Sequence, residues 1–152
     1  VCLTAVVAIG GVSAPASAKS KGYVFKYKGV SVTMNGAAKK LIKKAGKPSK
    51  KTVKKSCAYK GKDRTYTYKD FQLKTYSKTN NGAEYVSEIR FRSNKAVTKE
   101  GIRIGSSLKA VTKKYGKAKA RFGVYTFKKG SSKLQIMLNG NKVSAIRYFA
   151  SK

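Results

Sequence analysis

Four short sequence blocks occur twice in this chain, in the same order, and this duplication constrains the fold more than any other feature. The longest block, residues 37–47, aligns without gaps with residues 107–117. The other matches are 29–32 with 101–104, 66–68 with 125–127, and 86–91 with 143–148. Ordered self-similarity indicates a duplicated structural unit. We therefore predict two repeats, 19–95 and 96–152, packed as one domain because neither buries enough apolar surface alone.

The longest block has the periodicity of a short helix. In each copy, apolar residues recur three or four positions apart, as they do along one face of an amphipathic helix. These residues are Ala38, Leu41, Ile42 and Ala45 in the first copy, and Leu108, Val111 and Tyr115 in the second. We expect helices near residues 36–45 and 107–115.

Both predicted helices have a residue that favours the start of a helix at one end and a glycine that favours its termination at the other. Asn35 is the expected N-cap of the first helix, and Ser106 or Ser107 that of the second, because their side chains accept a hydrogen bond from a free backbone N–H. Gly46 and Gly116 follow the two stripes and adopt the left-handed conformation that ends a helix.

Downstream of each predicted helix the apolar period changes to two, which is typical of half-buried strands. The alternating segments are 65–68, 72–76 and 85–91 in the first copy, and 125–127, 133–138 and 142–149 in the second. Asn139-Gly140 has the composition of a tight hairpin turn, and Lys129-Gly130 is a weaker example. The predicted fold class is α+β: a tandem repeat of a short helix plus an antiparallel β-meander, with two antiparallel sheets.

The first eighteen residues carry no charge and are mostly small or apolar. Residues 1–12 form an apolar run that is too short to span a bilayer, and Ala16-Ser17-Ala18 has the form of a signal cleavage site. The basic start and initiating Met of a signal are missing, so we expect a signal-peptide remnant in residues 1–18, with sequence missing before Val1. We expect no lipid on Cys2, because Val1 precedes it where a small residue is expected. The protein is expected to be exported, cleaved after Ala18, and secreted or held at the cell surface.

The helix–meander unit, duplicated behind such a signal, resembles the β-lactamase-inhibitor-protein fold. Small outer-membrane assembly lipoproteins are built from single copies of a similar unit. A closer resemblance is to an uncharacterised secreted or lipoprotein-type family of Gram-positive gut bacteria, and it is carried by residues 56–68 and 98–105. The resemblance covers nearly all of the chain after residue 18. It implies the tandem α+β fold, and it implies no particular activity because those relatives lack an assigned one.

The composition argues against an enzyme. The chain of 152 residues has 36 Lys and Arg, 5 Asp and Glu, and no His. Without His there is no Ser–His or Cys–His pair, no imidazole base and no His metal ligand. Five scattered acids make a carboxylate metal site or an acid pair unexpected, so we predict no catalytic residue, no metal site and no cofactor. Residues 106–109 match the S-x-x-K motif of penicillin-recognising enzymes, but the K-T-G strand and the larger scaffold are missing.

After removal of residues 1–18 a single thiol, Cys57, remains, so no internal disulfide is available to the mature chain. We expect Cys57 to be a small buried hydrophobe. Stability must then come from the apolar core, for which ten Tyr and six Phe supply material.

The strongest surface signal is a lysine run. Nine of the seventeen residues from Lys39 to Lys55 are lysine and none is acidic. The segment after Gly46 contains Pro48 and lacks apolar periodicity, so we expect its lysines to be exposed and free to conform to a flexible polymer. The predicted polyanion-binding residues are Lys43, Lys44, Lys47, Lys50, Lys51, Lys54 and Lys55.

The net charge of +31 defines the partners that we expect. Thirty of the cations are lysine, a hydrated point charge that favours loose binding to distributed phosphates over base reading. We predict a non-catalytic secreted or cell-envelope binding protein, held on anionic cell-wall polymer or another extracellular polyanion, with no specific nucleic-acid recognition and no transmembrane segment in the mature chain. The alternative is a protein-binding inhibitor or envelope assembly factor that uses the sheet face. A purely solvated basic surface remains the simplest explanation of the charge.

Overall fold

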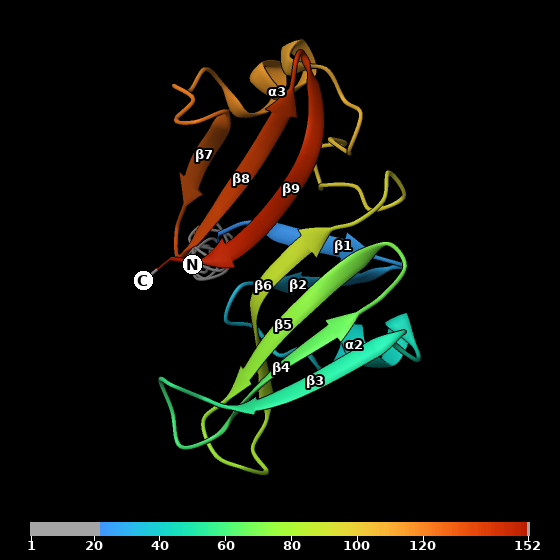
Figure 1. Cartoon of the computed structure of the whole chain (residues 1–152), viewed down its shortest axis with the longest axis vertical. Helices are drawn as coiled ribbons and strands as arrows, with labels where there is room; N and C mark the ends of the chain where they lie inside the picture. Colours follow the sequence, from blue (N-terminus) through green and yellow to red (C-terminus); the bar gives the residue numbers. More distant parts are fainter. Residues whose placement is uncertain (1–21, 152) are drawn as a thin grey trace, which may run out of the picture.

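The computed structural model describes residues 22–151. The predictions for the signal remnant, the Ala18 cleavage and Cys2 lie outside this range. The described chain is an α+β structure, in which antiparallel strands predominate and two short helices are present (Figure 1). Within the described residues, no helix is long and apolar enough to cross a bilayer.

Eleven elements follow one another along residues 22–151. In the first part these are β1 (Val24–Tyr27), β2 (Val30–Thr33), α2 (Lys39–Ala45), β3 (Lys50–Lys55), β4 (Lys62–Thr67), β5 (Phe71–Ser77) and β6 (Glu84–Phe91). In the second part they are α3 (Leu108–Tyr115), β7 (Val124–Lys129), β8 (Ser132–Asn139) and β9 (Lys142–Ala150). The predicted strands and the two predicted hairpin turns, at Lys129-Gly130 and Asn139-Gly140, are present.

The prediction of two sheets, one in each copy, is wrong. Seven strands form a single antiparallel sheet in the order β3-β4-β5-β6-β9-β8-β7, and β1 and β2 form a separate hairpin. The two predicted repeats meet where β6 pairs with β9 over three residue pairs, centred on Ile89 and Tyr148. Sequence periodicity describes each strand alone, whereas this junction joins residues far apart in the chain.

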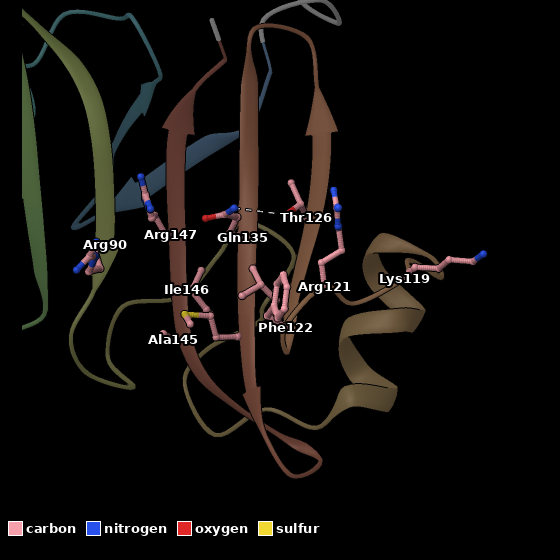
Figure 2. A pocket seen from close by; sticks show the side chains of 11 residues that line it. Arg90, Lys119, Arg121, Phe122, Thr126, Gln135, Ala145, Ile146 and Arg147 are labelled. Carbon is pink, nitrogen blue, oxygen red and sulfur yellow. Dashed lines mark hydrogen bonds between the residues drawn. The ribbon is translucent and has the colours of Figure 1, made fainter.

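The sheet has one covered face and one open face. Along β5 the buried Phe71, Leu73 and Thr75 alternate with partly exposed residues, and β8 and β9 show a similar alternation. The helices and the β1–β2 hairpin lie on the covered face (Figure 1). The open face carries Arg90 and Arg147, which are direct cross-strand partners on β6 and β9 (Figure 2).

The two helices are confirmed, but one predicted cap is wrong. Asn35 does not cap α2; it has a positive φ of 63° in the turn after β2, and Ala38 occupies the cap position without a side-chain hydrogen bond. Ser107 caps α3 by accepting a hydrogen bond from the Ala110 N–H. Gly46 and Gly116 end the helices at φ values of 80° and 87°, which favour glycine over residues with a Cβ. Their ψ values of −151° and 178° lie outside the left-handed helical region that was predicted for them.

Aromatic packing holds the β1–β2 hairpin against the junction of β6 and β9. The fully buried Phe25 ring lies 5.3 Å from Phe71, 5.6 Å from Phe91 and 6.5 Å from Tyr148, measured between ring centroids. Aromatic side chains bury more area than any others and contribute most to a core of this size. The short β6–β9 pairing is therefore stabilised from behind by the hairpin.

The burial of the tyrosines can be tested by unfolding the protein at alkaline pH. Burial is the main cause that raises the pKa above the usual value for seven of them: Tyr23, Tyr27, Tyr66, Tyr68, Tyr76, Tyr115 and Tyr148. A pKa that is raised in the folded state stabilises the protein below the unfolded value near pH 10, and this contribution is lost as pH rises above it. For the fully buried Tyr148 the loss is about 1.4 kcal/mol per pH unit.

We expect tyrosinate absorbance and loss of near-ultraviolet circular dichroism to rise together above about pH 10. The titration is best done in about 0.5 M NaCl, because salt screens the repulsion among lysines that also changes in this range. Full tyrosine ionisation with an intact near-ultraviolet spectrum would contradict the burial described above.

Candidate polyanion-binding surface

The seven predicted lysines come from α2, the connection after it, and strand β3. All seven are exposed. We call them the lysine surface: Lys43, Lys44, Lys47, Lys50, Lys51, Lys54 and Lys55. The prediction of exposure is therefore confirmed for every member.

No strand was predicted in the segment after Gly46, but the structure has one there. Lys50–Lys55 is strand β3, paired along its whole length with β4 at one edge of the sheet. All six of its residues are exposed, so neither face of this strand needs an apolar pattern. Periodicity therefore contains no signal for a strand of this kind, which is held by its backbone ladder with β4.

Strand geometry divides the lysine surface between two sides. Successive side chains of a strand point to opposite faces, so Lys50 and Lys54 project to one side and Lys51 and Lys55 to the other. Lys51 shares the side of Tyr66, its partner on β4, and its Nζ lies 5.2 Å from the centre of that ring. The lysines thus surround the edge of the sheet and do not form one flat patch.

A basic hollow of about 550 Å³ lies where β3 ends. Lys54 and Lys55 line it together with Lys60 and Lys62, and no acidic residue contributes to the lining. Sequence reasoning missed Lys60 and Lys62. The available signal was the hairpin itself, because the return of the chain at residues 56–61 makes Lys62 the direct partner of Lys55.

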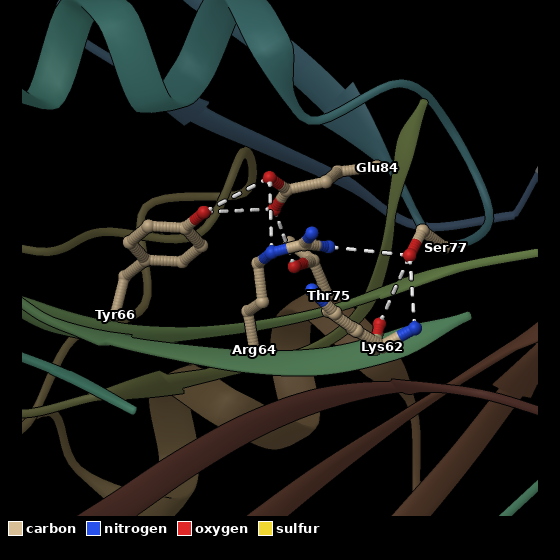
Figure 3. Close-up of polar contacts among 6 residues, drawn as sticks. All are labelled: Lys62, Arg64, Tyr66, Thr75, Ser77 and Glu84. Carbon is tan, nitrogen blue, oxygen red and sulfur yellow. Dashed lines mark hydrogen bonds and ion pairs between the residues drawn. The ribbon is translucent and has the colours of Figure 1, made fainter. Parts of the chain in front are cut away.

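A polar network supports this edge of the sheet from the covered face (Figure 3). Glu84 on β6 accepts hydrogen bonds from the Tyr66 hydroxyl (2.9 Å to Oε2) and from the Thr75 hydroxyl (2.7 Å). Arg64 Nε lies 3.6 Å from the same carboxylate, and Arg64 Nη1 donates to Ser77 Oγ at 3.2 Å. These contacts link β4, β5 and β6, the three strands that follow β3 in the sheet.

The same carboxylate contributes to the raised pKa of Tyr66. Burial is the main cause that raises the pKa of Tyr66, and the hydrogen bond to Glu84 adds to it. Like any tyrosine, Tyr66 is a neutral hydrogen-bond donor at physiological pH, and the raised pKa extends this state to more alkaline pH. Sequence reasoning gave Glu84 no role, because its partners on β4 and β5 precede it by nine to twenty residues in the chain.

Cys57 lies in the turn between β3 and β4, and the expectation that it is buried is wrong. Its thiol is exposed and forms no disulfide within the described chain. The turn that contains Cys57 extends past the end of the sheet (Figure 1), which leaves the thiol open to solvent. The two serines of the S-x-x-K match act as turn and cap residues, since Ser106 Oγ accepts from the Arg103 N–H and Ser107 caps α3.

Within residues 22–151, no group of three or more His, Cys, Asp or Glu side chains is placed to hold a metal ion. The chain was also compared with models of known protein families, with curated proteins and with solved structures, and no match was found.

Proposed function

We propose that this chain is a non-catalytic, secreted or cell-envelope binding protein that is held on an anionic polymer by the lysine surface. The observation that carries the proposal is strand β3, in which four lysines are displayed on an edge strand whose six residues are all exposed. A linear polymer with many phosphates can contact lysines on both sides of such an edge. The favoured partner is an anionic cell-wall polymer of the teichoic-acid type.

The positions of the acidic residues support this proposal. Glu84 and Glu88 form ion pairs with cations of the sheet. Asp70 accepts a hydrogen bond from Tyr27, and Glu100 accepts one from Tyr115. These four carboxylates serve the fold. The fifth acid, Asp63, is the cross-strand partner of Lys54 and forms no ion pair within residues 22–151, so the lysine surface keeps most of its positive charge for a partner.

The competing explanation is that the lysines protect the sheet. Lysine on an edge strand discourages pairing with a strand of another molecule, and β3 is an edge strand. This explanation requires only charge at the edge and no affinity for a polymer. Binding measurements separate the two explanations.

We also propose, as the resemblance in sequence implies, that the two halves are copies of one exported helix–meander unit. In support, α2 and α3 both end at a glycine, and each is followed by a meander that ends in β6 or β9. The halves differ at the matched segments 29–32 and 101–104, since the first contains β2 and the second has no strand.

The test replaces Lys50, Lys51, Lys54 and Lys55 by Gln together. In about 50 mM salt we expect affinity for purified teichoic acid to fall about tenfold or more, because four phosphate contacts with counterion release are lost. The slope of log affinity against log salt should decrease by about 3, at 0.7–0.9 per contact. Thermal stability should stay the same or rise as self-repulsion decreases.

A matched control replaces Lys109, Lys113, Lys114 and Lys117, which are exposed on and after α3. This variant has the same net charge as the first, so it measures the diffuse contribution of charge alone. Equal loss in both variants, or wild-type binding by the β3 variant, would mean that the lysine run is only a solvated face. Duplex DNA in place of teichoic acid reports whether the partner's chemistry matters beyond its charge.

A further inference from the structure

The open face of the sheet contains a second hollow, of about 850 Å³ (Figure 2). The residues that line it differ in type from those of the lysine surface. Three of its lining residues are arginines, namely Arg90, Arg121 and Arg147, and one is Lys119. The whole chain has six arginines and thirty lysines, so the ratio of the two is reversed here. Arginine differs from lysine in its planar fork of N–H donors, which binds carboxylate and phosphate in a bidentate way.

Polar side chains cross the hollow in one row. Arg90, Arg147, Gln135 and Thr126 are direct partners of one another on β6, β9, β8 and β7. With neighbouring strands about 4.8 Å apart, the row is about 14 Å long. Gln135 Nε2 donates to Thr126 Oγ1 at 3.4 Å, as Figure 2 shows. The row thus has two guanidinium groups at one end and neutral hydrogen-bonding groups at the other.

An apolar row lies beside the polar one. Ala145, Met137 and Val124 are also direct cross-strand partners, two positions along from Arg147, Gln135 and Thr126. Met137 is 46% exposed, which is unusual for a large apolar side chain in this protein. A ligand that lies across these strands therefore meets charge on one side and apolar surface on the other.

Glu88, which is only 8% exposed, forms ion pairs with both guanidinium groups. Its carboxylate lies 3.4 Å from Arg90 Nη2, 3.3 Å from Arg147 Nε and 3.3 Å from Lys74 Nζ. The Arg147 guanidinium also stacks on Phe149, with 4.7 Å from Cζ to the ring centre. One carboxylate offsets one of three positive charges, and arginines directly opposite each other repel. A second anion between them would relieve this repulsion.

Phe122, at the rim of the hollow, has an unusual backbone conformation and an exposed aromatic ring. Phe122 has a φ of 53° and is fully exposed, at 101%. Positive φ is a rare outlier for a bulky residue, and such outliers cluster at ligand-binding sites. The turn is closed by backbone hydrogen bonds of 3.0 Å in both directions between Arg121 and Val124, so Phe122 is held at its tip beside the hollow.

We propose that this hollow binds a small amphiphilic anion, with a carboxylate or phosphate group at Arg90 and Arg147 and an aromatic or aliphatic body along Met137 and Phe122. The volume lies in the range typical of small-ligand pockets. A polymer with distributed charge needs no arginine forks and no apolar row. The site is independent of the lysine surface, and its ligand is of a different class.

The test is an NMR titration of isotope-labelled full chain in about 150 mM salt, which screens diffuse attraction. The probes are 4-phenylbutyrate and phenyl phosphate, with inorganic phosphate and 4-phenylbutanol as the anion alone and the body alone. We expect one or both aryl anions to bind about tenfold more tightly than either partial probe, with shift changes confined to β6–β9 and the Phe122 turn. Comparison of the two aryl anions identifies carboxylate or phosphate as the preferred group.

Two variants and a control test the residues. Arg90→Lys with Arg147→Lys keeps the net charge and removes the two forks proposed to bind the anion, so we expect affinity to fall about tenfold. Phe122→Gly should weaken binding several-fold and raise the melting temperature by about 2–4 °C, because glycine accepts positive φ. Lys54→Gln with Lys55→Gln lowers the net charge by two on another surface and should leave this affinity unchanged.

Three results would overturn the proposal. The first is that the charge-preserving arginine variant binds the aryl anions as tightly as the wild type does. The second is that inorganic phosphate binds as tightly as the aryl anions. The third is that the NMR shift changes spread over the lysine surface. Each would mean that the hollow attracts anions only through the overall charge of the protein. Failure here leaves the polymer-binding proposal untouched, because that proposal is tested on β3.

Discussion

Replacement of Gly61 by alanine is expected to destabilise the protein by about 3 kcal/mol or more, and to detach the edge strand that carries the lysines. A Cβ at this position would lie 2.0 Å from the backbone oxygen of Ser77 and 2.6 Å from its carbonyl carbon. Real atoms do not approach so closely, and a backbone carbonyl within a ladder cannot turn away as a flexible side chain does. The end of the β3–β4 hairpin must therefore separate from β5.

The hydrogen bonds around Gly61 show what is lost with it. Its carbonyl accepts from the Ser56 N–H at 3.0 Å, and the adjacent Lys62 N–H donates to Ser77 Oγ at 3.0 Å. We expect urea denaturation to report the loss of stability and hydrogen exchange to report faster exchange in β3 and β4 than in β8 and β9.

Two controls accompany this variant. Gly29→Ala places a side chain at a φ of 82° where nothing lies within 4 Å, so it should cost only the conformational penalty of about 1–2 kcal/mol. Adding Ser77→Ala to Gly61→Ala should not restore stability, because the nearest atom is backbone. Wild-type stability of Gly61→Ala would show that the hairpin does not pack against β5 as described.

Glu88→Gln is expected to cost about 2 kcal/mol at low salt, and less at high salt. The carboxylate is buried among Lys74, Arg90 and Arg147, whose side chains are 41%, 50% and 38% exposed. Removing one partner of a fully buried ion pair costs about 3–5 kcal/mol, and solvent access to these three cations reduces that figure. The neutral amide keeps the shape of the side chain, so the change isolates its charge.

The matched control is Asp63→Asn. Asp63 is exposed and has no ion pair within residues 22–151, so this variant raises the net charge equally and should change the free energy of unfolding by less than about 0.5 kcal/mol. Urea denaturation of both variants at two salt concentrations provides the comparison. Equal effects of the two substitutions would mean that Glu88 acts only through the total charge of the protein.

Much of the secondary structure could be predicted because its signals are local. Apolar residues spaced three or four positions apart before Gly46 and Gly116 predict α2 and α3, because apolar residues on one helix face must be buried together. Alternation in segments such as 72–76 and 142–149 predicts half-buried strands for the same reason. Segments without buried side chains have no such signal. Strand β3 was not predicted because all six of its residues are exposed, and the predicted burial of Cys57 was wrong because it lies in a turn beyond the sheet.

The same distinction, between local signals and contacts made by the fold, applies to the candidate sites. The sequence by itself determined that the chain is strongly basic, that its lysines are densest before Lys55, and that they are exposed, because charge density is a local property and charges avoid the core. Only the tertiary structure decided that these lysines surround a sheet edge, and that Glu84 and Glu88 each bind cations from other strands. It alone brought Arg90 beside Arg147, since strand pairing joins residues that no local pattern relates.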